Sequence, residues 1–292
     1  MFFKSSYLGI DIRADNIRVA HLVKRGNKNI IKGLYEIENP LGTTVFKTQQ
    51  EQFAIKQVLA EIKQRLSSNS VVIGVSSNYA AFRYVNFPLL NKKELKEAIF
   101  WEMQEFDTIF SDEYISDYEI LEEQKNICRV LLVAVPKNLI MTYTKILTEA
   151  GFNIRAIDVY PLANARVLKT EKKTDVSAII DLGVTHSEIT IVENGILILN
   201  RNLDFPSNIS FENFLQEISR IFNFYFLQSK KSPIDKIILL GKNSALKEVF
   251  RNYFKIDTYL GNELECNFIV ENHSNIENPM DFFSAIGFGL RG

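Results

Sequence analysis

Two copies of one hairpin pattern constrain the fold of this chain more than any other feature of its sequence. In both copies an apolar run ends at an aspartate, a short polar turn follows, and apolar and polar residues then alternate, over residues 7–22 and 178–192. Alternation with a period of two is typical of a half-buried strand. The two aspartates, Asp11 and Asp181, stand about 170 residues apart, which predicts a chain built from two related halves.

The segments that follow the two hairpins also correspond in type and in order. They are a third strand, an amphipathic helix and a short strand of continuous apolar residues, at 30–37, 48–66 and 71–75 in the first half and at 196–200, 210–228 and 234–240 in the second. Two related α/β halves normally face each other across a cleft that binds a ligand. The duplication therefore predicts such a cleft between the halves.

Residues 82–159 interrupt this repeated order with an α+β block of two helices and several strands. Its first helix begins after Asn91, and Glu94 three residues later completes a capping-box signature. Its second helix is followed by Gly151, at a position where a left-handed backbone is favoured. The sequence therefore predicts a compact subdomain inserted into the duplicated scaffold.

Composition excludes several classes of protein. The net charge of -1 argues against a general nucleic-acid binder, which would carry an excess of Lys and Arg. Cys128 and Cys266 are too few for a disulfide framework or a thiolate metal site. No run approaches the roughly 20 apolar residues that span a bilayer. We therefore expect a cytoplasmic protein that inserts into no membrane directly and reaches the membrane only through a partner.

The turns of the two hairpins predict an anion-binding cleft. Asp11 and Asp181 could orient a hydrated Mg²⁺ that bridges phosphate oxygens. The turn at Gly183 would leave backbone N–H groups facing an anion. Gly241 and Asn243 lie in a strand-to-helix turn, which offers a helix N-terminus to a ligand. Each of these turns, taken alone, is also explained as an ordinary chain reversal.

These motifs, together with several others, resemble those of a known family. The first phosphate motif lies at 8–12, the second at 180–183 and an adenosine-type motif at 237–244, while further similarity is carried by 83–88, 98–102, 157–163 and the ending 284–292. With these residues the chain resembles the PilM family, the actin-like cytoplasmic proteins of type IV pilus assembly, along essentially its whole length. The resemblance implies a duplicated α/β fold of the actin-like, ribonuclease H-like type with an inserted α+β subdomain.

The resemblance also implies a plan of four subdomains. Subdomain 1A would comprise 1–81, a helix at 160–175 and a closing helix at 280–292; 1C would be the insertion at 82–159; 2A would comprise 176–204 and 234–279; and 2B would be shortened to 205–233.

A membrane-anchored partner follows from the same resemblance. It implies that the short cytoplasmic N-terminal tail of a PilN-like membrane protein binds, extended, in a groove between 1A and 1C, with other pilus platform proteins nearby. Arg83, Phe87 and Trp101 are the residues that we expect to line or support this groove. The alternative is that Trp101 belongs to the core and Arg83 is an ordinary surface charge.

The first turn departs from the family pattern in a way that bears on nucleotide binding. Residues 13–16 read Arg-Ala-Asp-Asn where the family has glycine and small hydroxyl residues, and Lys242 stands where a second glycine would lie. Asp15 places a negative charge near the expected phosphates, and two like charges ~4 Å apart repel by roughly 4 kcal/mol at an effective dielectric of about 20. Arg13 could offset this by reaching the phosphate itself. We therefore expect weak or absent binding of ATP and Mg²⁺ and no enzymatic activity.

Two other functions share the duplicated hairpins. One is an active actin-like ATP-binding protein or ATPase. The other is a cytoskeletal membrane tether of the FtsA kind, for which an amphipathic helix beyond the actin-like core is expected, whereas this sequence stops at Gly292.

Overall fold

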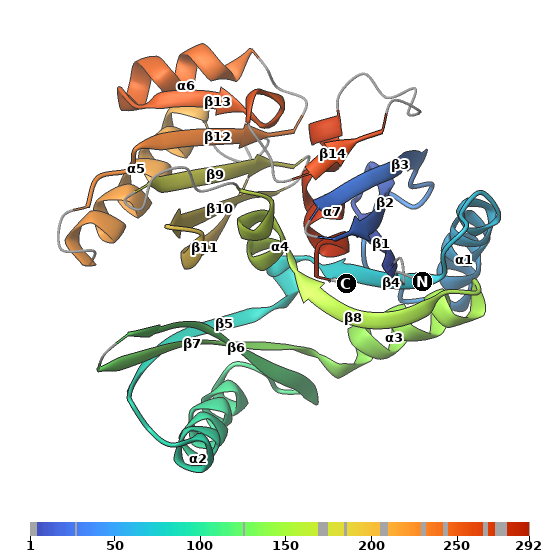
Figure 1. The fold of residues 1–292 in the computed structure, drawn as a ribbon, viewed down its shortest axis with the longest axis horizontal. Coiled ribbons are helices and arrows are strands. Elements are labelled where there is room, and N and C mark those ends of the chain that lie inside the picture. Colours follow the sequence, from blue (N-terminus) through green and yellow to red (C-terminus); the bar gives the residue numbers. More distant parts are fainter. Residues whose placement is uncertain are drawn as a thin grey trace.

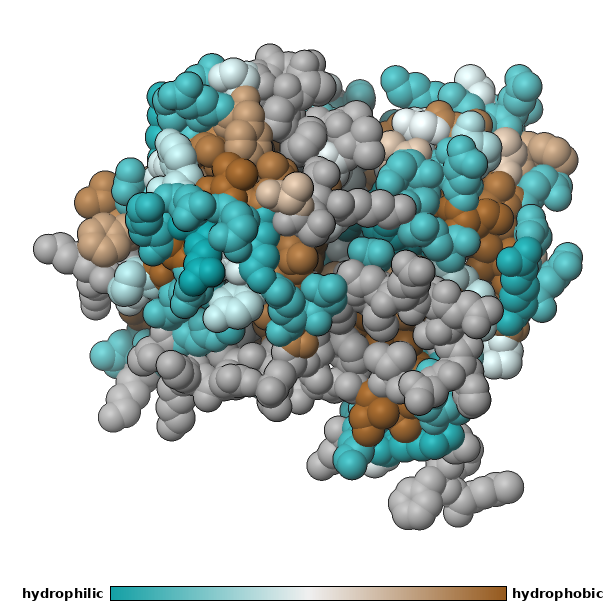
Figure 2. Space-filling model, turned by 90° about the horizontal axis from the view of Figure 1, so that it is seen from above, coloured by the Kyte–Doolittle hydropathy of each residue, from teal (hydrophilic) through white to brown (hydrophobic). Residues whose placement is uncertain are grey.

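The computed structural model describes residues 5–26, 28–124, 126–168, 175–183, 186–204, 210–228, 232–241, 245–264, 268–271 and 279–291. Two large sheets stand side by side with helices around them, and a small three-stranded sheet lies below them in Figure 1. Seen from above, hydrophilic residues cover much of both large parts, and hydrophobic residues form separate patches (Figure 2).

The first half is a six-stranded sheet with two helices on one face. Its elements are β1 (Ser5–Ile12), β2 (Asn16–Arg25), β3 (Lys28–Glu38), α1 (Gln49–Gln64), β4 (Ser70–Val75), α3 (Lys137–Glu149), β8 (Asn153–Val159) and β14 (Phe268–Val270). The strand order is β14-β3-β2-β1-β4-β8, with β1 antiparallel to β2 and parallel to β4. Buried side chains of α1 and α3 complete one core with the central strands.

The second half repeats this arrangement. Its elements are β9 (Val176–Leu182), β10 (His186–Glu193), β11 (Ile196–Asp204), α5 (Phe211–Gln228), β12 (Lys236–Leu240), α6 (Leu246–Phe254) and β13 (Asp257–Leu260), followed by a short 3₁₀ helix, η3 (Gly261–Glu263). Its order, β11-β10-β9-β12-β13, matches β3-β2-β1-β4-β8 strand for strand. The duplication predicted from the two hairpins is therefore confirmed.

The small sheet is formed by β5 (Ala81–Pro88), β6 (Tyr114–Gln124) and β7 (Ile127–Pro136) in the order β5-β7-β6. It is joined to β4 by a 3₁₀ turn, η1 (Ser77–Tyr79), and α2 (Lys92–Met103) with η2 (Gln104–Thr108) covers one of its faces. The predicted capping box begins α2, since the backbone N–H of Glu94 donates to Asn91 Oδ1 at 3.1 Å. A second link reaches β11, where the Tyr84 hydroxyl donates to Asn200 Oδ1 at 2.7 Å.

The strand pairing differs from two of the expected domain boundaries. Within the expected insertion 82–159, the small sheet ends at Pro136, because α3 packs into the first core and β8 pairs in parallel with β4. Within the expected subdomain 205–233, the described helix α5 buries its apolar side in the core of the second sheet. Periodicity identifies an element's type, but it does not say which sheet the element joins.

Two short helices form the layer between the halves. These are α4 (Tyr160–Val167) and α7 (Phe283–Gly289), the latter entered through η4 (Pro279–Phe282). The expected helices at 160–175 and 280–292 are thus shorter where the structure describes them. All seven residues of α7 are buried, and one apolar cluster joins Phe283, Ala285 and Ile286 to both sheets. A Cβ atom on Gly9 would lie 1.8 Å from the Ala285 carbonyl oxygen, so β1 and α7 approach each other at a distance that only glycine permits.

This contact predicts a large difference between two glycine substitutions. Gly9→Ala should lower the free energy of unfolding by about 3 kcal/mol, because the added methyl group meets backbone atoms of α7. Gly42→Ala meets no atom within 4 Å and should cost only about 1 kcal/mol, the penalty of its left-handed backbone at φ 63°. Urea denaturation of both variants measures the two costs, and equal costs would contradict the close approach.

Candidate functional site

A cleft of about 610 Å³ opens between the two halves, at the tips of both hairpins. Its first-half lining includes residues 12–15 and 76–79, and its second-half lining includes 181–183, 186–188 and Gly241. The sequence-predicted cleft is therefore present, and it contains most of the residues that we expected to bind a cofactor.

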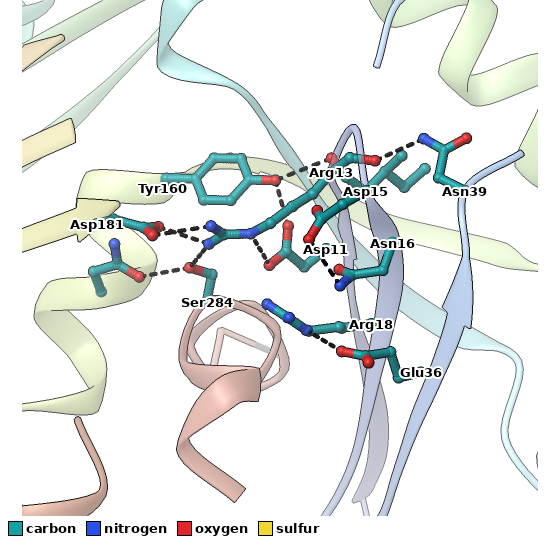
Figure 3. A network of polar contacts seen from close by, with 12 residues as sticks. Asp11, Arg13, Asp15, Asn16, Arg18, Glu36, Asn39, Tyr160, Asp181 and Ser284 are labelled. Atoms are coloured by element: carbon teal, nitrogen blue, oxygen red, sulfur yellow. Dashed lines mark hydrogen bonds and ion pairs between the residues drawn. The ribbon is translucent and has the colours of Figure 1, made fainter. Parts of the chain in front are cut away.

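Arg13 and Asp181 line this cleft, and the Arg13 guanidinium lies between Asp181 and the buried Asp11 (Figure 3). The aspartates stand near the ends of the equivalent strands β1 and β9, and their side chains are 1% and 7% exposed. Arg13 Nε donates to Asp11 Oδ2 at 2.8 Å. Its Nη1 and Nη2 atoms donate to the two oxygens of Asp181 at 2.9 and 2.6 Å.

Side chains from the helices between the halves complete the site. The Tyr160 hydroxyl of α4 donates to Asp11 Oδ1 at 2.5 Å, and the Arg13 Cζ atom lies 5.6 Å from the centre of the Tyr160 ring. Arg13 Nη2 also donates to Ser284 Oγ of α7 at 3.1 Å, and Ser284 in turn donates to Asn164 Oδ1 at 2.9 Å. Tyr160 and Ser284 were not predicted, because no sequence pattern relates them to the hairpins.

Electrostatics fix the protonation of this network. Burial disfavours the charged form of Arg13, but the carboxylates of Asp11 and Asp181 outweigh burial, so the arginine pKa is raised well above its ordinary value. Burial, reinforced by Asp11, raises the pKa of Tyr160. Arg13 is consequently a permanent cation, and Tyr160 is a permanent neutral donor.

The carboxylates have the right chemistry for Mg²⁺, but their arrangement does not fit the ion. All four oxygens of Asp11 and Asp181 accept a hydrogen bond, three from Arg13 and one from Tyr160. A divalent ion between them would have to displace a guanidinium of the same sign of charge. Among the described residues there is also no group of three or more His, Cys, Asp or Glu side chains that could hold a metal.

The glycines expected to approach a phosphate have structural reasons of their own. A Cβ atom on Gly183 would lie 2.5 Å from the His186 carbonyl oxygen. Gly241 has a φ of 101°, and a Cβ atom there would lie 2.7 Å from the Leu182 carbonyl oxygen. Asn243 and Lys242 lie outside the described residues. Asp15 is exposed at the tip of the first hairpin, where its carboxylate accepts from the Asn16 side chain at 3.1 Å.

Glu188 is a further cleft residue that sequence reasoning missed. It is paired with Asp181 across β9 and β10, and it accepts a hydrogen bond from Ser77 Oγ of the first half at 2.6 Å. Burial raises the pKa of its carboxyl group to about 8, and the nearby Asp181 adds to this effect. The alternation of β10 identifies Glu188 as a polar position, but only the folded structure shows that the other half covers it.

A second, smaller cavity of about 280 Å³ lies between the small sheet and the first half. Its apolar lining consists of Ile115 of β6, Val133 and Val135 of β7, Ile140 of α3, Ile157 of β8 and Leu162 of α4. Its polar rim carries the carboxylates of Asp117 and Glu119 from β6 and of Asp158 from β8, together with the Arg291 guanidinium. We call this cavity the β6–β8 groove.

Arg83, Phe87 and Trp101, which we expected to line or support the partner's groove, lie on the α2 side of the small sheet, opposite the β6–β8 groove. On β7, Cys128, Val130, Leu132 and Ala134 face α2, whereas Val133 and Val135 face the groove. The β5–β7 register pairs Arg83 with Leu132 and Phe87 with Cys128, so both lie on the α2 face. Arg83 is bound by Glu102 at 2.8 Å, and Phe87 is buried beneath α2. Trp101 is 70% exposed on α2, so it is not a core residue either.

Comparison with known proteins places the chain in a family. The family model described as type IV pilus assembly protein PilM matches residues 9–212. The chain belongs to the PilM family. The matched region begins within β1 of this PilM-family chain and contains β2, the small sheet and the β9–β11 strands.

Solved structures agree with this family in fold. The PilM–PilN type IV pilus biogenesis complex matches at 20% identity and a TM-score of 0.80, with 98% of each chain covered. The cytoplasmic domain of EpsL, an inner-membrane component of the type II secretion system of Vibrio cholerae, matches at 12% identity and 0.54, covering 99% of this chain and 96% of that one. The ethanolamine utilization protein EutJ from Carboxydothermus hydrogenoformans matches at 9% and 0.50, covering 100% and 91%. The predicted actin-like α/β fold is confirmed.

The surroundings of Glu188 in this PilM-family chain predict a pH-dependent effect on stability. The pKa of the Glu188 carboxyl group is about 8 in the folded protein and lower in the unfolded chain. The group therefore does not affect the free energy of unfolding below the unfolded pKa, and it lowers that free energy increasingly as the pH rises from the unfolded pKa to the folded pKa. Glu188→Gln should therefore match the wild type at pH 4.5 and become more stable than it by up to about 1.4 kcal/mol per pH unit toward pH 8. Urea denaturation at several pH values measures the difference. The exposed Glu97→Gln is the control, and a constant difference at all pH values would contradict the assignment.

Proposed function

We propose that this chain acts in type IV pilus assembly by holding the cytoplasmic tail of a PilN-like membrane protein in the β6–β8 groove. The observation that carries this proposal is a cavity with an apolar floor between two unpaired strand edges. Family membership and the fold shared with the PilM–PilN complex structure support it.

The two strand edges suit an extended peptide. Among the described residues, β6 pairs only with β7, and β8 pairs only with β4, so each has one free edge. Successive residues of both strands line the groove, 115–119 of β6 and 157–159 of β8. A strand that lines a cavity with successive residues presents its backbone edge to that cavity. A peptide can then add as a strand through main-chain hydrogen bonds, with alternate side chains in apolar pockets.

The charges at the rim indicate the composition of the tail. Asp117 and Glu119 stand on the β6 side of the groove, and neither has a salt bridge among the described residues. On the β8 side, Asp158 is already neutralised by Arg166 and by Arg291, the latter at 2.8 Å. The groove therefore favours a tail with apolar residues at alternate positions and with Lys or Arg toward β6.

The cleft between the halves has a different part in this proposal. Because Arg13 binds both aspartates, we propose that ATP and Mg²⁺ bind weakly or not at all and that the protein is not an ATPase.

Within the described residues no helix is both long and apolar enough to cross a membrane. We propose that the protein is cytoplasmic and held at the inner membrane by its partner, beside other platform proteins.

Peptide binding tests the groove. A fluorescent peptide with the sequence of the partner's N-terminal tail should bind the wild type, and Ile115→Glu should weaken binding at least about tenfold, because it places a charge on the apolar lining. Ile115 is 42% exposed, so this change spares the core. Trp101→Ala is the matched control on the opposite face and should leave the affinity unchanged. Loss of binding in Trp101→Ala, or no binding by the wild type at high micromolar peptide, would contradict the proposal.

Thermal unfolding tests the cleft. A ligand that binds only the native state raises its stability by about 2.7 kcal/mol at one hundred times its dissociation constant. Millimolar Mg-ATP should leave the melting temperature of the wild type unchanged, and phosphate release should stay at background. A rise of several degrees would instead favour an active actin-like ATP-binding protein, and polymerisation detected by light scattering would favour a cytoskeletal tether.

A further inference from the structure

We infer that Arg13 is a built-in cation that takes the place of a bound divalent ion between the two halves and joins them at the cleft without any ligand. The inference rests on the part of the proposed function that concerns the cleft, and its outcome is separate from that of the groove proposal.

The Arg13 side chain reaches from the first half to the second. Arg13 belongs to the tip of the first hairpin, but its two-pronged contact is made with Asp181 of the second half, 168 residues away in sequence. An arginine that binds a carboxylate through two parallel N–H donors forms one of the strongest side-chain pairs available to a protein. The side chain therefore joins the halves while it also contacts Asp11 of its own hairpin.

Two buried carboxylates at this point need a positive charge between them. Asp11 and Asp181 are almost fully buried and share one guanidinium. Without a cation the two carboxylates would face each other in a site of low dielectric, where an unpaired charge is strongly destabilising. A cation is therefore required at this point, and the chain supplies it from its own sequence.

Neighbouring residues hold Arg13 in place. Ser284 of α7 accepts from Nη2, and the Tyr160 ring of α4 flanks the guanidinium. The Asn39 side chain donates to the Arg13 carbonyl oxygen at 2.6 Å and fixes the hairpin tip. These contacts hold the guanidinium at the midpoint between the two carboxylates, which is the place that a bridging ion would take.

This arrangement contains a latent cation site. Removing the side chain of Arg13 would leave one buried carboxylate from each half and no positive charge between them. Two carboxylates with room for water are suitable ligands for Mn²⁺ or Mg²⁺. Replacing Arg13 by a small residue should consequently create metal binding that the wild type lacks.

The experiment measures Mn²⁺ binding by electron paramagnetic resonance of the free ion, together with melting temperature. Wild type should show no binding up to millimolar Mn²⁺ and no thermal shift. Arg13→Ala should melt lower, bind Mn²⁺ at least about tenfold more tightly than wild type, and regain about 5 °C on binding. Arg13→Ala combined with Asp181→Asn should bind no Mn²⁺ and melt above Arg13→Ala alone, because the stranded carboxylate is gone.

Two further variants keep the test decisive. Arg18→Ala removes another buried arginine of the same hairpin, one that pairs with Glu36 inside its own half, so it should gain no Mn²⁺ response. If Arg13→Ala does not fold, Arg13→Lys keeps the charge without the two-pronged contact, and it should melt between wild type and the double variant without binding Mn²⁺. Equal Mn²⁺ binding by wild type and Arg13→Ala, or a lysine variant as stable as wild type, would overturn the inference.

Discussion

The close packing of α7 against both sheets is the constraint on which the rest of the structure depends. The helix is buried along its whole length, and Gly9 admits its backbone to the surface of β1. This contact sets the spacing between the two halves. That spacing in turn brings the ends of β1 and β9 within reach of one arginine side chain and places Ser284 beside it.

The two cavities differ in chemistry: the cleft between the halves is polar and charged at Arg13, whereas the β6–β8 groove has an apolar floor. At the cleft, Asp11, Arg13, Asp181 and Tyr160 already satisfy one another, so a ligand at this point would have to break their contacts before making its own. The β6–β8 groove instead offers apolar surface and two strand edges that pair with no further strand in the part of the chain that the structure describes. We therefore expect a partner to bind at the β6–β8 groove, where strand edges lack partners among the described residues, and we expect the cleft to be rigid, because its charged groups are paired with one another.

Much of the fold could be predicted from the sequence because its signals are local. The hairpins, the capping box at Asn91 and the duplication all depend on residues close together in the chain. The sheet to which β8 belongs could not be predicted, since a strand pattern does not specify its neighbour. Likewise β5 carries apolar and polar residues on both faces, so its alternation could not tell which face α2 covers. The face of the small sheet on which Arg83 and Phe87 lie could therefore not be predicted.

Prediction of the site followed the same division. Asp11, Arg13 and Asp181 were identified from their motifs, but Arg13 was expected to reach a phosphate, because its pairing depends on a distance between halves that no motif contains. The pairing gives the hairpin tip the character of a ligand that is covalently attached to its own receptor. A free nucleotide closes such a cleft in proportion to its concentration, whereas a tethered group has a fixed effective concentration that no cellular pool can change. Under the role that we infer for Arg13, the contact between the halves would not depend on a nucleotide pool, and a signal that alters the shape of the chain would be expected to act at its surface.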